Sequence, residues 1–413
     1  MILTPDILYD REEIDFCYPT VRQWQSDVER VGLLPLIGFA GTRGKSTVLR
    51  LVESVLQSLR FQIATWTDLG VQIDGRHQRA ELAGWGRAMG RLAEGSIDIC
   101  LQELDWAAVN VAGLPEQMYP VTVHTGLTNE ISSNSTRTLI GLDGTYKLAA
   151  ATNLGGILVA NADDYLSTEI LAESSATLIL VSQSLESPFI RQHLDDGGSG
   201  AWVENGYIWI GAKSGAQRFG HVREYPITFS GEADFNVKNL LLALGMLHAI
   251  GVDLPSIQRS FRRFRAAWDI LPASMNMYEY HDARAVIDQL APAWILKDVL
   301  KVLNPGAERR QITVVGDLGW IEADEVYEVG RALGRYRGAI VVHGDQEEER
   351  INNFKRGLAS NPYPPLLSSL PTERRAINRA FKALRPNDVL IILTTRESAA
   401  AHRAVQRHIA TLS

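Results

Sequence analysis

A glycine-rich stretch near the start of the chain carries the residues with the clearest chemistry. It reads Gly41-Thr42-Arg43-Gly44-Lys45-Ser46-Thr47. Glycines let backbone N–H groups approach phosphate oxygens closely, and the amino end of a following helix favours an anion. Lys45 is placed to reach the β- and γ-phosphates of a nucleotide, and the Ser46 hydroxyl is a ligand for Mg²⁺. The stretch therefore predicts a loop that binds ATP and magnesium.

The segments on both sides of this loop are those that a phosphate loop requires. Residues 34–40 form a short apolar run, typical of a buried parallel strand. Apolar residues then recur at helical spacing from Val48 to Leu59. The longer Walker A pattern fails because position 39 is Phe39, whereas the shorter pattern Gly-Thr-x-Gly-Lys-Ser/Thr matches. The alternative is a glycine-rich turn that only precedes a helix.

Apolar segments alternate with helical stretches through the rest of the first half. Those that predict buried strands are residues 97–101, 119–125, 156–160 and 177–181. Because strands that alternate with helices usually pair in parallel, they predict a doubly wound α/β sheet. Near residue 200 the pattern changes to a small antiparallel section, in which Asn205-Gly206 suits a type I′ hairpin turn. This section is expected to reach Phe229, followed by a helix at 237–250.

A second alternating series begins after residue 267. Its strands are expected at residues 285–288, 312–316, 339–343 and 389–394. A chain of 413 residues is too long for one hydrophobic core. We therefore expect three parts: an N-terminal extension at residues 1–34 that contains a short helix at 21–31, an ATP-binding central domain at 35–267, and a Rossmann-like C-terminal α/β domain at 268–413.

Composition and charge restrict the classes of protein that fit. The formal net charge of −7 disfavours a nucleic-acid-binding protein that uses a broad basic surface. The two cysteines, Cys17 and Cys100, favour a reducing cytoplasm over a disulfide framework. No apolar run approaches the ~20 residues that cross a bilayer, and the first residues lack a signal-peptide pattern. A cytoplasmic protein without its own transmembrane segment is the prediction.

Residues 41–47, together with Val48 and Arg50, resemble the phosphate loop of the Mur ligase superfamily. The form with Arg43 is most similar to the ligase subunit of poly-γ-glutamate synthase, whereas folylpolyglutamate synthases and cyanophycin synthetases are more distant. The resemblance extends over about residues 35–413, with its specific motifs in the first half. It implies that ATP is bound by Gly41, Thr42, Arg43, Gly44, Lys45, Ser46 and Thr47.

The resemblance also implies a magnesium site and an adenine contact. Glu103 follows a predicted strand and corresponds to the family's magnesium-binding glutamate, and a carboxylate beside a phosphate loop suits that cation. A solvated glutamate at a strand end is the alternative. Residues 235–239 resemble the family's His-Asn-x-x-Asn segment, which assigns Asn236 and Asn239 to the nucleotide. Asparagines at a helix start also serve as caps.

Further correspondences concern a second metal and the acceptor substrate. Lys147 lies near the lysine that several Mur ligases carbamylate to hold a second magnesium, with a gap of one residue; a surface lysine on a helix is the alternative. Residues 161–164 are similar to the family's Asn-x-Asp-Asp segment. Asp288 matches the first residue of the C-terminal Asp-Tyr-Ala-His-x-Pro motif. It is the candidate for orienting an amine, or else it caps a turn.

Three segments depart from the family pattern. Residues 127–132 lack the histidine that usually binds the second metal, so only Asn129 or Glu130 remains to substitute for it. Asp269 stands where many relatives have an arginine that reaches the ATP phosphates. In the C-terminal motif only the aspartate is kept. The nucleotide-binding residues are thus intact, while those for the second metal and the acceptor are altered.

The resemblance implies an ATP-dependent ligase that joins a carboxylate to an amine through an acyl phosphate, with Lys45, Glu103 and Asp288 as catalytic candidates. The 34 residues before the first strand are expected to be too few for a domain that binds UDP-linked substrates, which favours glutamate or a polymer. The poly-γ-glutamate ligases also imply a membrane-protein partner. The alternatives are a non-catalytic or regulatory ATP-binding subunit and an unrelated phosphate-loop kinase or ATPase.

Overall fold

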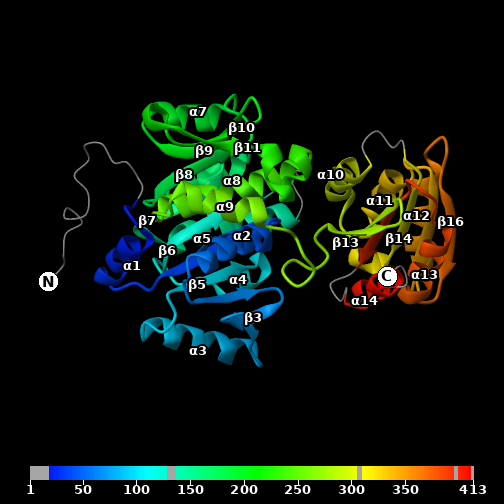
Figure 1. Cartoon of the computed structure of the whole chain (residues 1–413), viewed down its shortest axis with the longest axis horizontal. Helices are drawn as coiled ribbons and strands as arrows, with labels where there is room; N and C mark the ends of the chain where they lie inside the picture. Colours follow the sequence, from blue (N-terminus) through cyan, green and yellow to red (C-terminus); the bar gives the residue numbers. More distant parts are fainter. Residues whose placement is uncertain (1–17, 128–135, 305–308, 395–398, 411–413) are drawn as a thin grey trace. The chain divides into compact units, whose positions relative to one another are not determined.

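The chain divides into two compact units, one ending at Phe264 and the other starting at Arg265. The computed structural model describes residues 18–127, 136–304, 309–394 and 399–410. Within these residues the first unit contains an eleven-stranded sheet and the second a six-stranded sheet, both covered by helices (Figure 1).

The sheet of the first unit has the strand order β11-β10-β9-β8-β7-β6-β1-β5-β2-β3-β4. Its strands are β1 (Leu36–Ala40), β2 (Ile63–Thr67), β3 (Gly70–Ile73), β4 (Arg76–His77), β5 (Ile99–Leu104), β6 (Tyr119–His124), β7 (Thr152–Asn161), β8 (Thr177–Ser182), β9 (Ser199–Glu204), β10 (Tyr207–Ala212) and β11 (Gln217–His221). In this spatial order, every pair of neighbouring strands from β9 through β1 to β2 is parallel. Antiparallel pairs form both edges.

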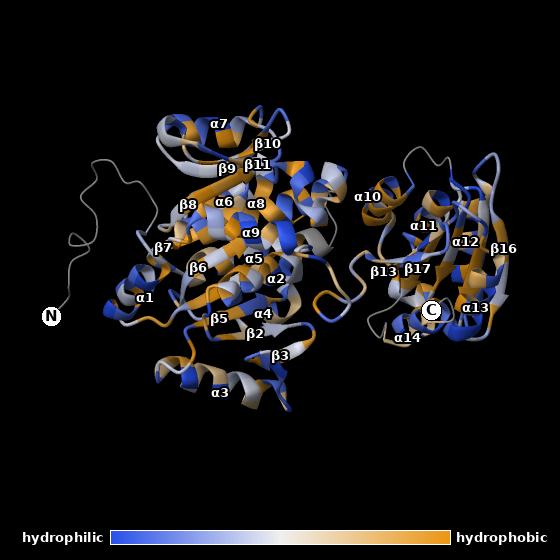
Figure 2. Cartoon of the chain, in the orientation of Figure 1, coloured by the Kyte–Doolittle hydropathy of each residue, from blue (hydrophilic) through white to orange (hydrophobic). Residues whose placement is uncertain are grey.

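The α-helices of this unit are α1 (Val21–Arg30), α2 (Lys45–Ser58), α3 (Glu81–Ala93), α4 (Trp106–Ala112), α5 (Thr136–Ala151), α6 (Tyr165–Ala172), α7 (Pro188–Asp195), α8 (Asp234–Ala249) and α9 (Leu254–Arg263). α8 is apolar on nearly all sides because it packs between β7, β8 and α2, and Figure 2 shows it in the colours of hydrophobic residues. The predicted mostly parallel sheet with a small antiparallel section is therefore confirmed.

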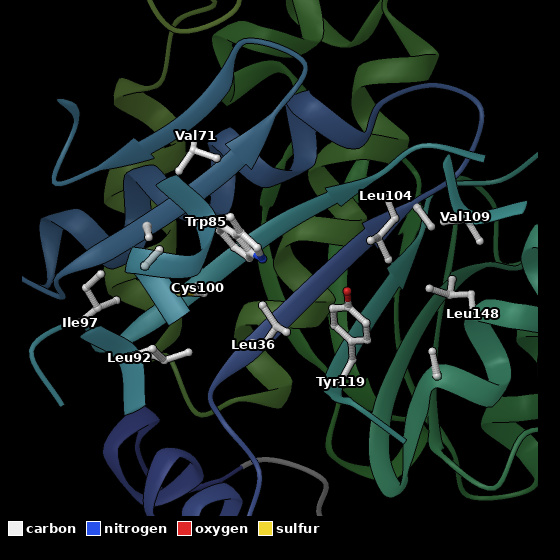
Figure 3. Packing of buried hydrophobic residues seen from close by; sticks show 14 of the residues in the cluster. Leu36, Val71, Trp85, Leu92, Ile97, Cys100, Leu104, Val109, Tyr119 and Leu148 are labelled. Carbon is white, nitrogen blue, oxygen red and sulfur yellow. The ribbon is translucent and has the colours of Figure 1, made fainter. Parts of the chain in front are cut away.

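The central strands are buried because helices cover both of their faces. Every residue of β1 and of β6 is buried. On one face, Leu36 of β1 and Cys100 of β5 pack in a cluster with Trp85, Tyr119 and Leu148 (Figure 3). Since the strands cannot shift in register without exposing this cluster, their carboxyl ends are held at fixed positions.

The antiparallel section differs in extent from the expectation. The hairpin turn is confirmed, with Asn205 and Gly206 at φ of 52° and 79°. The ladder stops at His221, however, and two 3₁₀ helices follow, η3 (Val222–Glu224) and η4 (Pro226–Gly231). Proline removes a backbone donor, and left-handed residues within η4 turn the chain away from an extended path.

The second unit has the strand order β12-β13-β17-β14-β15-β16, with only the β12–β13 pair antiparallel among its described strands. Its elements are β12 (Asn276–Tyr280), β13 (Ala283–Gln289), α10 (Ala293–Leu303), β14 (Gln311–Val315), η6 (Leu318–Trp320), α11 (Val326–Leu333), β15 (Gly338–His343), α12 (Glu348–Ala359), β16 (Leu366–Leu370), α13 (Glu373–Ala383), β17 (Val389–Thr394) and α14 (Ala399–Ala410). The expected Rossmann-like α/β unit is confirmed. Among the described residues, no helix has the length and apolar character needed to cross a membrane.

Candidate functional site

The predicted phosphate loop lies at the carboxyl end of β1, where the chain turns into α2. β1 pairs with β5 on one side and β6 on the other, so that the ends of both neighbours lie beside the loop. Phe39, which breaks the longer Walker A pattern, is fully buried in β1 and pairs with Glu103. The strand therefore continues to Ala40, and the loop begins at Gly41.

Two glycines give the loop its shape. Gly41 and Gly44 have φ of +131° and +91°, conformations that residues with a Cβ rarely adopt. A Cβ on Gly41 would lie 2.1 Å from Thr125 Oγ1, and one on Gly44 would lie 2.2 Å from Asn239 Oδ1. The backbone is thus packed on one side against β6 and α8. Such a loop, ahead of a helix, suits the triphosphate of a nucleotide.

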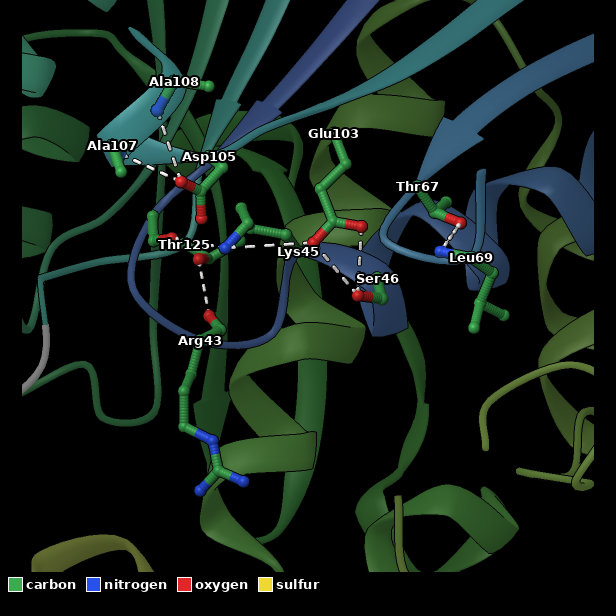
Figure 4. A network of polar contacts seen from close by, with 11 residues as sticks. Arg43, Lys45, Ser46, Thr67, Leu69, Glu103, Asp105, Ala107, Ala108 and Thr125 are labelled. Carbon is green, nitrogen blue, oxygen red and sulfur yellow. Dashed lines mark hydrogen bonds and ion pairs between the residues drawn. The ribbon is translucent and has the colours of Figure 1, made fainter. Parts of the chain in front are cut away.

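Lys45 and Ser46 begin α2 and point toward Glu103 at the end of β5 (Figure 4). The Lys45 ammonium donates to the Gly41 carbonyl at 2.9 Å and lies 3.8 Å from Glu103 Oε1. The Ser46 hydroxyl lies 3.1 Å from each carboxylate oxygen of Glu103. The structure therefore brings together three residues that lie up to 58 positions apart.

Glu103 is in a position where a cation would be favourable. Burial raises the pKa of its carboxyl group, and the nearby charge of Asp68 adds to this, while Lys45 and the Ser46 hydroxyl oppose it. A serine hydroxyl beside a carboxylate matches Mg²⁺, which takes one or two protein ligands and completes its shell with phosphate oxygens and water. Among the described residues, no group of three or more His, Cys, Asp or Glu could hold a metal by itself. The donors present fit a magnesium ion that is bound together with ATP.

Asp68 is a residue of this site that the sequence did not reveal. It follows β2, which pairs with β5, and its backbone also makes a hydrogen bond that stabilises ionised Glu103. β2 was not predicted, so nothing in the sequence indicated that the turn after it would lie beside Glu103. A strand predicted at 63–67 would have indicated that Asp68 lies at the same edge of the sheet as Glu103.

Residues 125–127, which we call the bracket, hold the phosphate loop from the β6 side. The Thr42 N–H donates to the Gly126 carbonyl at 2.9 Å, and the Thr42 hydroxyl donates to the Leu127 carbonyl at 3.1 Å. The Thr125 hydroxyl donates to the Arg43 carbonyl at 2.6 Å (Figure 4). The loop conformation is therefore set by β6 as well as by its own glycines.

Residues 161–164 lie next to the bracket and divide into two roles. Asp164 Oδ2 accepts the Leu127 N–H at 2.5 Å, so this carboxylate supports the bracket. Asp163 accepts from the Ser182 hydroxyl at 2.6 Å and from the Gln183 N–H at 2.9 Å, which ties β7 to the end of β8. Within the segment that resembles Asn-x-Asp-Asp, Asp163 therefore has a structural role, whereas Asp164 lies next to the phosphate loop.

Of the two asparagines of α8, Asn239 lies against the loop, and neither caps the helix. Asn236 donates to the Ile227 carbonyl at 2.9 Å, and Asn239 donates to Asn236 Oδ1 at 3.2 Å. Both side chains are buried, and Asn239 Oδ1 has no hydrogen-bond partner among the described residues. It lies beside Gly44, where it packs against the loop. The predicted contact with adenine stays a prediction.

Two other candidates contact residues outside this group. Lys147 on α5 donates to Asp143 Oδ2 at 2.7 Å and to Asn110 Oδ1 at 3.2 Å. Asp288 is buried in β13 of the second unit, where its Oδ1 accepts the Met275 N–H at 3.3 Å. Carbamylation of Lys147 and an amine-orienting role of Asp288 stay predictions. Asn129 and Glu130 lie outside the described residues.

Replacement of Gly44 by alanine should destabilise the protein and weaken ATP binding. A Cβ in the left-handed conformation costs about 1–2 kcal/mol, and here it would also collide with Asn239. Gly90 of α3 is the matched control, because a Cβ there meets nothing within 4 Å. Thermal unfolding and ATP titration of both variants provide the measurement. Equal behaviour of Gly44→Ala and Gly90→Ala would show that the loop tolerates a side chain.

A second prediction concerns pH and the buried His124. Burial lowers the pKa of its imidazole from 6.5 to about 4; the charge of Asp164 opposes this and that of Lys238 adds to it. Between these values the unfolded chain binds a proton that the folded chain does not. The contribution of neutral His124 to stability is therefore fully present above pH 6.5 and is lost as the pH falls toward about 4. The free energy of unfolding should fall relative to that of His124→Asn by about 1.4 kcal/mol per pH unit. Urea unfolding of both proteins between about pH 7 and pH 5 measures the difference, and parallel curves would contradict it.

No protein-family model matches the chain. Cyanophycin synthetase of Nostoc sp. is 23% identical over 382 residues, which cover 88% of this chain and 42% of that protein. UDP-N-acetylmuramoylalanine–D-glutamate ligase of Prochlorococcus marinus is 24% identical over 264 residues, which cover 62% of this chain and 50% of the other. The chain thus spans less than half the length of the cyanophycin synthetases that it matches.

Solved structures with the same fold cover nearly the whole chain. A pseudomurein peptide ligase type C from Methanothermus fervidus superposes with a TM-score of 0.61 at 14% identity, over 92% of this chain and 79% of that one. Folylpolyglutamate synthase from Thermotoga maritima gives a TM-score of 0.58 at 12% identity, over 91% and 90%. The fold is that of the Mur ligases, as the resemblance implies. The finer likeness to the ligase subunit of poly-γ-glutamate synthase stays a prediction.

Proposed function

We propose that the chain is an ATP-dependent ligase that joins a carboxylate to an amine. The observation that carries this proposal is the convergence of Lys45, Ser46 and Glu103 at a phosphate loop. It occurs on a fold shared with peptide ligases and folylpolyglutamate synthase. A phosphate loop alone would also suit a kinase or an ATPase, and the fold favours the ligase.

The reaction follows from the charges in this site. Residues 41–47 would hold the triphosphate, and Lys45 would neutralise charge on the γ-phosphoryl oxygens as that group is transferred. Ser46 and Glu103 would hold a magnesium ion, whose charge stabilises the phosphate oxygens. A carboxylate oxygen of the substrate attacks the γ-phosphorus and ADP leaves, which gives an acyl phosphate. The amine nitrogen then attacks the acyl carbon, phosphate leaves, the nitrogen loses a proton, and an amide results.

Glutamate or a polyamide is the substrate class that the relatives favour. Their names refer to cyanophycin, D-glutamate and folylpolyglutamate. In this proposal Asp288 orients the amine. A membrane-protein partner remains an expectation from the likeness to the poly-γ-glutamate ligases, and a cytoplasmic location remains an expectation from the cysteine content. These assignments extend the proposal and do not carry it.

Phosphate release in a substrate panel tests the proposal. The protein would be incubated with ATP and Mg²⁺ together with carboxylates such as glutamate and short acidic peptides, with amines such as free amino acids, and with both. Release that requires one carboxylate and one amine is the expected result. Release that depends on neither would indicate an ATPase. Formation of ADP without released phosphate, when a hydroxyl compound is supplied instead, would indicate a kinase.

The second candidate is a non-catalytic or regulatory ATP-binding subunit. Two observations among the described residues favour it. Lys147 is engaged by Asp143 and Asn110, and no group of three or more His, Cys, Asp or Glu is present that could hold a second metal. The same panel separates the two candidates. ATP binding without turnover in any combination would support the regulatory subunit and contradict the ligase.

A further inference from the structure

A buried histidine at the end of β6 has both ring nitrogens in hydrogen bonds. The Gly126 N–H donates to His124 Nδ1 at 3.2 Å, and His124 Nε2 lies 3.1 Å from the Thr145 hydroxyl. That hydroxyl donates its own proton to the Gly141 carbonyl at 2.8 Å. Its oxygen must therefore accept from His124, which places the imidazole proton on Nε2 and leaves Nδ1 as an acceptor.

His124 and Asp164 both accept hydrogen bonds from the backbone of the bracket. The two N–H groups of the bracket, at Gly126 and Leu127, donate to His124 Nδ1 and Asp164 Oδ2. The two carbonyls of the same residues accept from the N–H and the hydroxyl of Thr42. Gly126 thus contacts the buried His124 and Leu127 contacts the partly buried Asp164, while both residues also contact the phosphate loop.

Without the hydrogen bond to His124, the backbone at Gly126 would be held less firmly than the backbone at Leu127. Gly126 has φ of +100° and no Cβ, so its flanking peptide planes can rotate at little cost. A buried N–H without an acceptor costs enough to drive that rotation toward another partner. The peptide plane of this N–H is joined through the Gly126 Cα to the plane that carries the Gly126 carbonyl. Its rotation would therefore displace that carbonyl from the Thr42 N–H. The acceptor at His124 Nδ1 is what opposes it.

We propose that His124 is a positioning residue for the phosphate loop: its neutral imidazole accepts the Gly126 N–H and thereby fixes the carbonyl that holds Thr42. The inference rests on the proposed function, since that function assigns the loop to ATP. His124 itself touches neither phosphate nor metal in this account. It acts through Gly126 alone.

Two substitutions at position 124 separate positioning from packing. Asparagine carries an oxygen near the place of Nδ1, whereas glutamine reaches the place of Nε2 and leaves the Gly126 N–H without an acceptor. ATP in the presence of Mg²⁺ should bind about tenfold more weakly to His124→Gln, while His124→Asn retains most of the affinity. Thermal unfolding without nucleotide, measured for both, reports packing. A purely structural histidine would lower both stabilities and leave the ATP affinity of the folded protein unchanged.

The outcomes distinguish this inference from the proposed function. If the folded wild type does not bind ATP, the proposed function fails and the inference fails with it. If the wild type and His124→Gln bind ATP equally, the inference alone is overturned. If His124→Gln does not fold, ¹⁵N NMR of histidine-labelled wild type decides, because the inference requires an unprotonated Nδ1 at neutral pH. A proton on Nδ1 would overturn it.

Discussion

Replacement of Lys45 by alanine is expected to abolish ATP-dependent turnover and to weaken ATP binding at least about tenfold. Lys45 is the cation at the centre of the loop, 2.9 Å from the Gly41 carbonyl and 3.8 Å from Glu103. Its ammonium would face the β- and γ-phosphates, where charge is greatest during transfer of the phosphoryl group. Loss of one such group typically lowers turnover by about 10²–10³-fold.

Calorimetric titration of ATP and the phosphate-release assay would measure the two effects. Lys213→Ala is the matched control, because Lys213 is an exposed lysine that pairs with Asp195 and lies outside the phosphate loop. The control should behave as the wild type does. Undiminished ATP affinity of Lys45→Ala would mean that residues 41–47 are not a nucleotide-binding loop.

Replacement of Glu103 by glutamine should have the second largest effect. Glutamine keeps the size of the side chain and a hydrogen-bonding oxygen for Ser46, but it removes the negative charge that would bind magnesium. Turnover should fall by about 10²-fold, and half-maximal activity should require at least about tenfold more Mg²⁺. Because only the charge changes, the loss should appear without gross unfolding.

Activity measured against the Mg²⁺ concentration tests this expectation, with thermal unfolding recorded beside it. Glu173→Gln, an exposed glutamate at the end of α6, serves as the matched control. If Glu103→Gln reaches half-maximal activity at the same Mg²⁺ concentration as the wild type, Glu103 does not bind the metal. Loss of the folded state would instead show that Glu103 mainly offsets the partly buried charge of Lys45.

The sequence predicts best what depends on neighbouring residues. The loop at 41–47 was recognisable because an apolar strand and an amphipathic helix flank it directly. The hairpin at Asn205-Gly206 was recognisable because one dipeptide sets its turn. Glu103 was found through the resemblance to the Mur ligases. Its position agrees with that assignment, because carboxyl ends of parallel strands share one edge of the sheet.

The remaining site residues depend on contacts between distant segments. Asp68 follows β2, a strand that was not predicted, and it comes beside Glu103 through the pairing of β2 with β5. His124 lies within an apolar strand, where a histidine looks like any other core residue. Its role depends on Thr145, Gly126 and the loop together. No spacing in the sequence encodes that arrangement.

Transfer of oxygen from the substrate tests the central claim most directly. A carboxylate that supports phosphate release would be supplied with ¹⁸O in its carboxyl group, together with ATP, Mg²⁺ and the amine, and the released phosphate would be analysed by mass spectrometry. The ligase account predicts one ¹⁸O atom in each phosphate, because the bridging oxygen of the acyl phosphate comes from the carboxylate. Phosphate without label would show that water attacks ATP directly, which would contradict it.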